Sequence, residues 1–264
     1  MATRPRRSCL ALPASNERML AKGGALAADE IVVDLEDGVA PEDKERARDN
    51  VSLAQARGTL AVRINKGSLA DIEAAAAVAD VIVVPKVESV EDVAAVTAAT
   101  ALPLEVQIET ARGLVEVERI AACPQVEALV FGPGDFAASL GVPVLTIGSG
   151  ASAYAMARIA VAARAFGLQV IDGPHAALDD DAALRASAEQ ALALGYDGKW
   201  AIHPSQLDTL HDVFTPDVAD VERARRIVAA ADGAIRLDGE MVDEATKKLA
   251  AGVLARAAGH EERR

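Results

Sequence analysis

The chain has 264 residues, which is enough for two small domains or for one α/β barrel around a single core. Its 27 basic and 40 acidic residues give a net charge of −13, which argues against a protein that binds the phosphate backbone of nucleic acid. The residues are 51% hydrophobic but only 3% aromatic, which favours a core of Ala, Val, Leu and Ile on repeated helices and strands.

The sequence also bears on compartment and membrane contact. No stretch reaches the roughly eighteen apolar residues that span a bilayer, and the first twenty residues lack the apolar run of a signal peptide. Cys9 and Cys123 are far apart and have no metal-ligand spacing. We therefore expect a cytoplasmic protein with two ordinary thiols and no membrane partner.

Short apolar runs alternate with helical patterns eight times along the chain. Strands are expected at residues 8–13, 31–36, 60–65, 81–86, 104–109, 126–131, 169–172 and 199–203. Helical patterns begin near residues 17 and 90, include apolar positions 114, 117 and 120, and cover 42–56, 71–78, 153–166 and 182–194. Residues 141–152 are expected to form a loop. Eight such units predict a (β/α)₈ barrel, an α/β fold.

The last fifty residues are extra to that count. Residues 216–231 favour a helix, 237–243 an irregular crossing segment and 244–258 a terminal helix. We expect a barrel domain at 1–214 and a C-terminal helical extension at 215–264, packed on the barrel or on a neighbouring subunit.

Polar residues end several of the expected strands. Since the carboxyl ends of barrel strands meet on one face, where barrel enzymes place their active sites, these residues should converge there. They are Glu36, Asp37, Arg63, Asn65, Lys86, Glu109, Asp135, Asp172 and His203. We expect Arg63, Glu36, Asp37 and Lys86 to contribute to substrate binding.

Glu109 and Asp135 follow neighbouring strands and predict a hard-cation site. Mg²⁺ takes oxygen ligands, commonly one or two carboxylates with water and substrate oxygens, and the lack of a His/Cys cluster argues against zinc. Helix capping is the alternative explanation for each acid.

Arg63 lies within an apolar strand and requires an anionic partner. It is suited to binding a carboxylate or a developing enolate oxygen, and an internal salt bridge with Glu36 or Asp37 is the structural alternative. Lys86 has the same two interpretations. His203 precedes a proline and is expected to be a hydrogen-bonding residue at a strand end.

Motifs along nearly the whole chain resemble the HpcH/HpaI aldolase and citrate lyase family, in its citrate lyase β-subunit-like branch. They are LPASNER at 12–18, VDLEDGV at 33–39, VRIN at 62–65, VPK at 84–86, IETARG at 108–113, GYDGK at 195–199 with IHP at 202–204, and GEMVD at 239–243.

The resemblance implies a barrel that binds Mg²⁺ and makes or breaks a carbon–carbon bond beside an acyl-CoA thioester. It implies that Glu109 and Asp135 are the metal ligands and that Arg63 contacts substrate. Asp243 resembles the acid/base that the family's C-terminal segment delivers into a neighbouring subunit's site, so a homo-oligomer, trimer or hexamer, is implied. Residues 16–18, with Asn16 and Arg18, would lie near the CoA phosphates.

Three functions follow as hypotheses. The first is a Mg²⁺-dependent lyase for citryl-CoA, malyl-CoA, citramalyl-CoA or a related thioester, or for the reverse condensation. The second is a metal-dependent aldolase for free 2-keto acids, because the segment GPGD at 132–135 looks closer to that branch. The third is a non-catalytic subunit that binds a small carboxylic acid or another metabolite.

Overall fold

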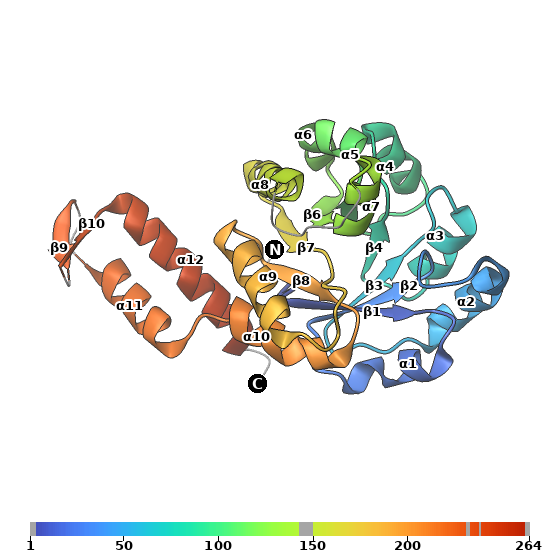
Figure 1. Ribbon diagram of the computed structural model, residues 1–264, viewed down its shortest axis with the longest axis horizontal. Coiled ribbons are helices and arrows are strands. Elements are labelled where there is room, and N and C mark those ends of the chain that lie inside the picture. The colour runs from blue at the N-terminus through green and yellow to red at the C-terminus, as the bar shows by residue number, and fades with distance from the viewer. Residues whose placement is uncertain (1–3, 143–149, 231–232, 238, 262–264) are drawn as a thin grey trace. The chain divides into compact units, whose positions relative to one another are not determined.

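A computed structural model describes residues 4–142, 150–230, 233–237 and 239–261 (Figure 1). Eight parallel strands form a closed barrel in chain order, with the last strand paired to the first. They are β1 Ser8–Pro13, β2 Glu30–Asp34, β3 Thr59–Arg63, β4 Val81–Val84, β5 Leu104–Ile108, β6 Val126–Phe131, β7 Gln169–Asp172 and β8 Gly198–Ala201. The predicted (β/α)₈ barrel is confirmed.

Helices lie around the outside of the strands, as Figure 1 shows. They are α1 Glu17–Lys22, α2 Lys44–Asn50, α3 Leu69–Ala76, α4 Val90–Thr97, α5 Ala111–Val115, α6 Val117–Ala121, α7 Pro133–Ser139, α8 Gly150–Ala165, α9 Asp181–Ala193 and α10 Leu207–Phe214. Short 3₁₀ turns are η1 Gly23–Ala25, η2 Pro41–Asp43, η3 Val51–Leu53 and η4 Pro204–Gln206. None of the described helices is both long and apolar enough to cross a bilayer.

The interior of the barrel is filled mostly by small and branched side chains, together with one tryptophan. They include Cys9, Val32, Ala61, Val81, Val83, Ala128, Val130, Ile171 and Trp200. Side chains alternate between the two faces of a strand, so Asp34 and Arg63, two residues beyond Val32 and Ala61, also point inward. Both lie at the carboxyl ends of their strands, which places a largely buried charge pair at the top of the apolar interior.

Several boundaries differ from the sequence-based expectation. The strand expected at 31–36 ends at Asp34, so Glu36 and Asp37 lie in the following loop. The helix expected at 42–56 is a short α2 between two 3₁₀ turns. The expected loop at 141–152 is helical from Gly150 onward, and 143–149 lie outside the described residues. Helix α10 was not expected, and α7 begins at Pro133, so Asp135 lies in its first turn and not before it.

Inter-residue contacts divide the chain into two compact units, Arg6–His211 and Asp212–Arg264 with the stretch before Arg6. The second unit contains α11 Val218–Ala229, β9 Ile235–Leu237, β10 Glu240–Val242 and α12 Glu244–Glu261. The two strands pair antiparallel, so the prediction of an irregular segment at 237–243 is wrong. Ala224, Ile227, Val242 and Ala250 form a small core of this unit's own.

Candidate active site

Charged side chains converge at the carboxyl ends of β2 to β6. Arg63 ends β3, Glu36 and Asp37 follow β2, Lys86 follows β4, Glu109 follows β5, and Asp135 lies in the first turn of α7 after β6. The ion pairs and hydrogen bonds among these residues join the six into one network.

Arg63 is held by two acidic residues and an aromatic ring. Its Nε and Nη2 atoms donate to the two carboxylate oxygens of Asp34 at 2.7 and 2.6 Å, and its Nη1 is 3.1 Å from Glu36 Oε2. The guanidinium carbon lies 5.3 Å from the centre of the Trp200 ring. Burial disfavours the charged guanidinium, but the bond and charge of Asp34 outweigh it and raise the pKa of Arg63. Arg63 is therefore fully charged, and its two bonds to Asp34 fix the orientation of the guanidinium.

Asp34 is the anchor of this arrangement. Burial opposes its ionisation, but the bonds from Arg63 and from the amides of Glu36 and Gly38 lower the pKa of Asp34 below its usual range. Asp34 was not among the predicted site residues, because it ends an apolar run and was assigned to the strand. Strand register could have identified it, since Asp34 pairs directly with Arg63 across β2 and β3.

Lys86 connects the two expected metal ligands. Its backbone N–H donates to Glu109 Oε1 at 2.7 Å. Its Nζ lies 2.6 Å from Glu36 Oε1, 3.3 Å from Asp37 Oδ2 and 3.8 Å from Asp135 Oδ2. Burial works against the ammonium, but these carboxylates, Glu36 first, raise the pKa of Lys86.

Glu109 is 2% exposed. Burial raises its pKa to about 7; the Lys86 N–H opposes that rise, while the charges of Glu36 and Asp135 add to it. Gly132, which begins the turn into α7, packs directly on this side chain. A Cβ at position 132 would lie 2.3 Å from Glu109 Oε2 and 2.4 Å from Glu109 Cβ.

The residues present fit a magnesium ion. The available donors, Glu109 and Asp135, are carboxylate oxygens, and the neighbouring Glu36 Oε2 is buried and ion-paired with Arg63 Nη1 at 3.1 Å. Within the described ranges, no three His, Cys, Asp or Glu side chains are grouped closely enough to enclose a metal by themselves. An open site of two carboxylates that leaves positions for water and substrate oxygens is characteristic of Mg²⁺.

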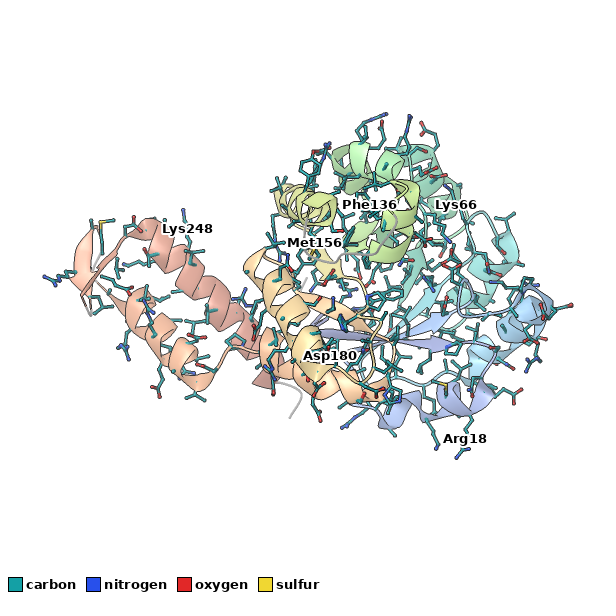
Figure 2. The ribbon with its side chains drawn as sticks, in the orientation of Figure 1. Arg18, Lys66, Phe136, Met156, Asp180 and Lys248 are labelled. Atoms are coloured by element: carbon teal, nitrogen blue, oxygen red, sulfur yellow. The ribbon has the colours of Figure 1, made fainter. Side chains whose placement is uncertain are left out.

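The remaining predicted site residues are Asn16, Arg18 and Asp243. Asn16 accepts a bond from the Met19 amide at 3.1 Å and so caps α1. Arg18 is exposed on α1, where Figure 2 labels it. Asp243 belongs to the C-terminal unit, and its Oδ1 accepts bonds from the amide and hydroxyl of Thr246 at 2.9 and 2.8 Å.

Two further strand-end residues have structural partners. Asp172 forms a fully buried ion pair with Lys199 of β8. His203 Nδ1 accepts from the Ser205 amide at 3.2 Å and caps η4, which confirms the expectation of a hydrogen-bonding residue.

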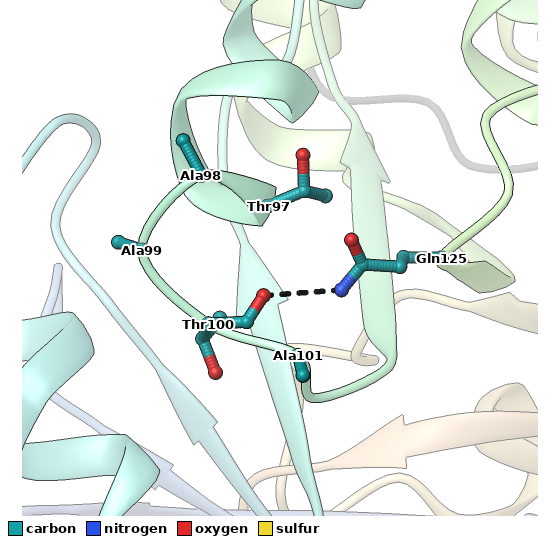
Figure 3. A pocket seen from close by; sticks show the side chains of 6 residues that line it. All are labelled: Thr97, Ala98, Ala99, Thr100, Ala101 and Gln125. Carbon is teal, nitrogen blue, oxygen red and sulfur yellow. Dashed lines mark hydrogen bonds between the residues drawn. The ribbon is translucent and has the colours of Figure 1, made fainter.

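A pocket lies between the end of α4 and the loop before β6, at the amino-terminal ends of β5 and β6 (Figure 3). Thr97, Thr100, Gln125 and three alanines line it, and Gln125 Nε2 donates to the Thr100 carbonyl at 3.2 Å. None of the six lining side chains is titratable, so the pocket provides no acid, base or charged ligand.

A closed parallel barrel with charged groups gathered at its carboxyl-terminal face is the architecture of a (β/α)₈ enzyme. The family model for HpcH/HpaI aldolase/citrate lyase matches residues 7–204. The chain therefore belongs to this family of carbon–carbon lyases.

Two named relatives come from Cereibacter sphaeroides. A (3S)-malyl-CoA thioesterase is 38% identical, and an L-malyl-CoA/beta-methylmalyl-CoA lyase is 37% identical. Each alignment covers 96% of this chain and 95% of the relative. The match thus extends through the C-terminal unit as well as the barrel.

Solved structures from Mycobacterium tuberculosis share the fold. The protein CitE, in complex with magnesium, acetoacetate and coenzyme A, superposes with a TM-score of 0.85 at 32% identity over 97% of this chain and 99% of that chain. A citrate lyase beta subunit complexed with oxaloacetate and magnesium gives 0.72 at 31% identity over 80% of this chain and 98% of that chain.

Proposed function

We propose that this protein is a Mg²⁺-dependent acyl-CoA lyase that cleaves a malyl-CoA-type thioester into a 2-oxo acid and a shorter acyl-CoA, or runs the reverse condensation. The observation that carries the proposal is the buried Glu109, held by the Lys86 amide in the same network as Asp135 and the fixed Arg63. This arrangement provides metal-binding oxygens together with an oriented cation for a developing negative charge. The relatives' names supply the substrate class.

Magnesium bound by Glu109 and Asp135 would polarise the hydroxyl and carboxylate of the substrate as a Lewis acid. Arg63 would hold the thioester oxygen as it becomes an enolate, because its guanidinium is charged and has a fixed direction. Glu36, Asp37 and Lys86 would line the acid-binding side. Asn16 and Arg18 would lie along the CoA phosphates.

Asp243 would remove the hydroxyl proton. The electrons of that O–H bond form the new carbonyl, the carbon–carbon bond breaks, and its electron pair moves to the thioester enolate, which is then protonated to the acyl-CoA. The Thr246 amide and hydroxyl lower the pKa of Asp243, so its carboxyl group is ionised at neutral pH.

We further propose that Asp243 works in the site of a neighbouring subunit of a cytoplasmic homo-oligomer, a trimer or a hexamer. A mixture of two inactive variants tests this arrangement. Asp243→Asn and Glu109→Gln should each abolish turnover, while mixed oligomers should regain up to about a quarter of the wild-type rate because one kind of interface then has both intact residues. If each site used its own subunit's Asp243, the mixture would stay inactive.

The reaction itself is tested with (3S)-malyl-CoA and Mg²⁺. A lyase releases glyoxylate and acetyl-CoA in equal amounts, without free thiol. The closely similar thioesterase relative favours a second candidate, hydrolysis, which releases malate and one equivalent of free CoA thiol. Separate assays for the 2-oxo acid and the thiol distinguish the two reactions.

The hypotheses of a free 2-keto acid aldolase and of a metabolite-binding subunit predict different results. An aldolase would act on pyruvate without CoA. A binding subunit would retain malyl-CoA affinity when Glu109 is replaced by Gln. Calorimetric titrations of acetyl-CoA, malyl-CoA and pyruvate, with and without Mg²⁺, separate these outcomes from the proposed lyase, for which Asp243→Asn keeps metal and ligand binding but loses turnover.

A further inference from the structure

Lys86 contacts the two expected metal ligands through two different groups of its own. Its backbone amide fixes Glu109 Oε1, and its side-chain ammonium approaches Asp135 Oδ2 at 3.8 Å. The residue has φ +52°, within the left-handed backbone region that residues other than Gly, Asn and Asp rarely adopt. This backbone conformation accompanies an amide bonded to Glu109 while the side chain reaches the loop after β2.

The ammonium lies among carboxylates contributed by different elements. Glu36 and Asp37 come from the loop after β2, and Asp135 comes from α7. The other cation of this network, Arg63, has two of its nitrogens bonded to Asp34. Arg63 Nη1 also lies 3.1 Å from Glu36 Oε2, so Lys86 shares Glu36 with Arg63 and is itself paired with Asp37 and Asp135.

A divalent ion bound to Asp135 and Glu109 would compete with that ammonium. Two cations attracted to the same oxygens repel each other, and the repulsion is appreciable at separations of a few ångströms even in a polar medium. The Lys86 side chain is 34% exposed, so it has room to withdraw toward solvent while its backbone amide stays bonded to Glu109.

We propose that Lys86 is a tethered cation of this site: its ammonium holds the carboxylates together before metal arrives and sets the affinity for Mg²⁺ by competing with the ion. Lys86 is thus a positioning residue through its amide and a competitor through its side chain. The inference rests on the proposed magnesium site, but it does not depend on which acyl-CoA is the substrate or on which bond is broken.

Lys86→Met tests the proposal, because it removes the charge and retains a backbone amide and a side chain of similar length. Calorimetric titration of the metal-free protein should show Mg²⁺ binding tightened at least about fivefold, with the gain reduced in high salt. Thermal unfolding should show a lower melting temperature without metal and a larger rise on adding Mg²⁺. Arg119→Met, which removes one positive charge from a surface pair with Glu116, should leave the Mg²⁺ affinity unchanged.

Lys86→Arg keeps the charge and should retain the wild-type affinity within about twofold. If Lys86→Met weakened Mg²⁺ binding or left it unchanged in a folded protein, the competing role would be wrong. If the Met variant did not fold, Lys86→Gln would serve, with the same tightening expected and the same contrary result decisive. If the wild-type protein bound no Mg²⁺, this inference would fail together with the metal site. If Mg²⁺ binding responded as described but no thioester were cleaved, the inference would stand and the proposed reaction would fall.

Discussion

Arg63 and Asp34 form a two-point contact between neighbouring strands at the top of the barrel interior. Nε meets Oδ1 at 2.7 Å and Nη2 meets Oδ2 at 2.6 Å, with both side chains largely buried. Such paired bonds fix direction as well as distance. The contact leaves Nη1 directed toward Glu36 and sets the orientation of the charged group that would face the substrate.

Asp34→Asn should lower kcat/KM for the thioester about 100-fold while leaving Mg²⁺ binding within about threefold. The amide has one acceptor oxygen, and its NH₂ group faces one guanidinium nitrogen and the backbone amide of either Glu36 or Gly38, so Arg63 loses its fixed direction. Steady-state kinetics with calorimetry of the metal-free variant separates the two effects. Asp43→Asn, which disrupts an exposed pair with Arg46, is the matched control and should retain wild-type kinetics. An active Asp34→Asn enzyme would contradict an orienting role.

Gly132 supports Glu109 from the neighbouring loop. A methyl group at position 132 would overlap both the carboxylate and the Cβ of Glu109, so Gly132→Ala must displace the Glu109 side chain. We expect Mg²⁺ affinity to fall at least about tenfold, as when a supporting contact of a metal ligand is lost. Gly134→Ala, two residues later with nothing within 4 Å of its added Cβ, should bind Mg²⁺ normally. Equal affinities in the two variants would show that Glu109 does not bind the metal.

The regular parts of the barrel could be predicted because clear breaks bound its apolar runs. The bounds of β1, β6 and β7 match the predicted 8–13, 126–131 and 169–172. The start of α7 was not predicted because Gly132, Pro133 and Gly134 look like chain breakers, although proline at the first turn is compatible with starting a helix. The β9–β10 pair was missed because strands of three residues are too short to show a period of two.

The site was partly predictable for a similar reason. Acids and bases at strand ends must meet on one face of a parallel barrel, so Glu36, Lys86 and Glu109 could be grouped without coordinates. The partner of Arg63 could not be chosen that way, because Asp34, Glu36 and Asp37 are all close in sequence and only strand register distinguishes them. The left-handed backbone of Lys86 has no signal in its residue type.

Because Glu109 is buried, we expect its ionised form to lower the free energy of unfolding of the metal-free protein. Its pKa is raised to about 7, so the folded protein holds a proton that the unfolded chain releases near pH 4.5, and this contribution to stability is lost as pH rises between those values. Glu109→Gln has no such penalty and keeps an acceptor for the Lys86 amide. At pH 8 without metal it should be more stable than wild type by about 1–3 kcal/mol, and the gain should largely disappear by pH 5. Urea unfolding at both pH values measures the difference, and a pH-independent gain would exclude titration of Glu109 as its cause.

At the other end of the barrel, the positive charge of Arg6 balances a cluster of acidic side chains. Its Nε lies 2.9 Å from Glu30 and 2.6 Å from Glu105, and it also pairs with Glu127. Burial, followed by the charge of Glu30, raises the pKa of Glu105 well above its usual range. The Arg6 guanidinium is thus the cation that these three carboxylates share.

Arg6→Met should therefore reduce the free energy of unfolding by about 3–5 kcal/mol, because it leaves buried acids without their cation. Glu105→Gln should be tolerated and should lose less stability than wild type as pH rises, since a raised carboxyl pKa means that the favourable protonated form is lost on alkalinisation. Denaturant unfolding of both variants from pH 6 to pH 9 tests the pair of expectations. A harmless Arg6→Met, or a Glu105→Gln protein that weakens with pH as steeply as wild type, would show that this cluster does not govern the stability of the barrel.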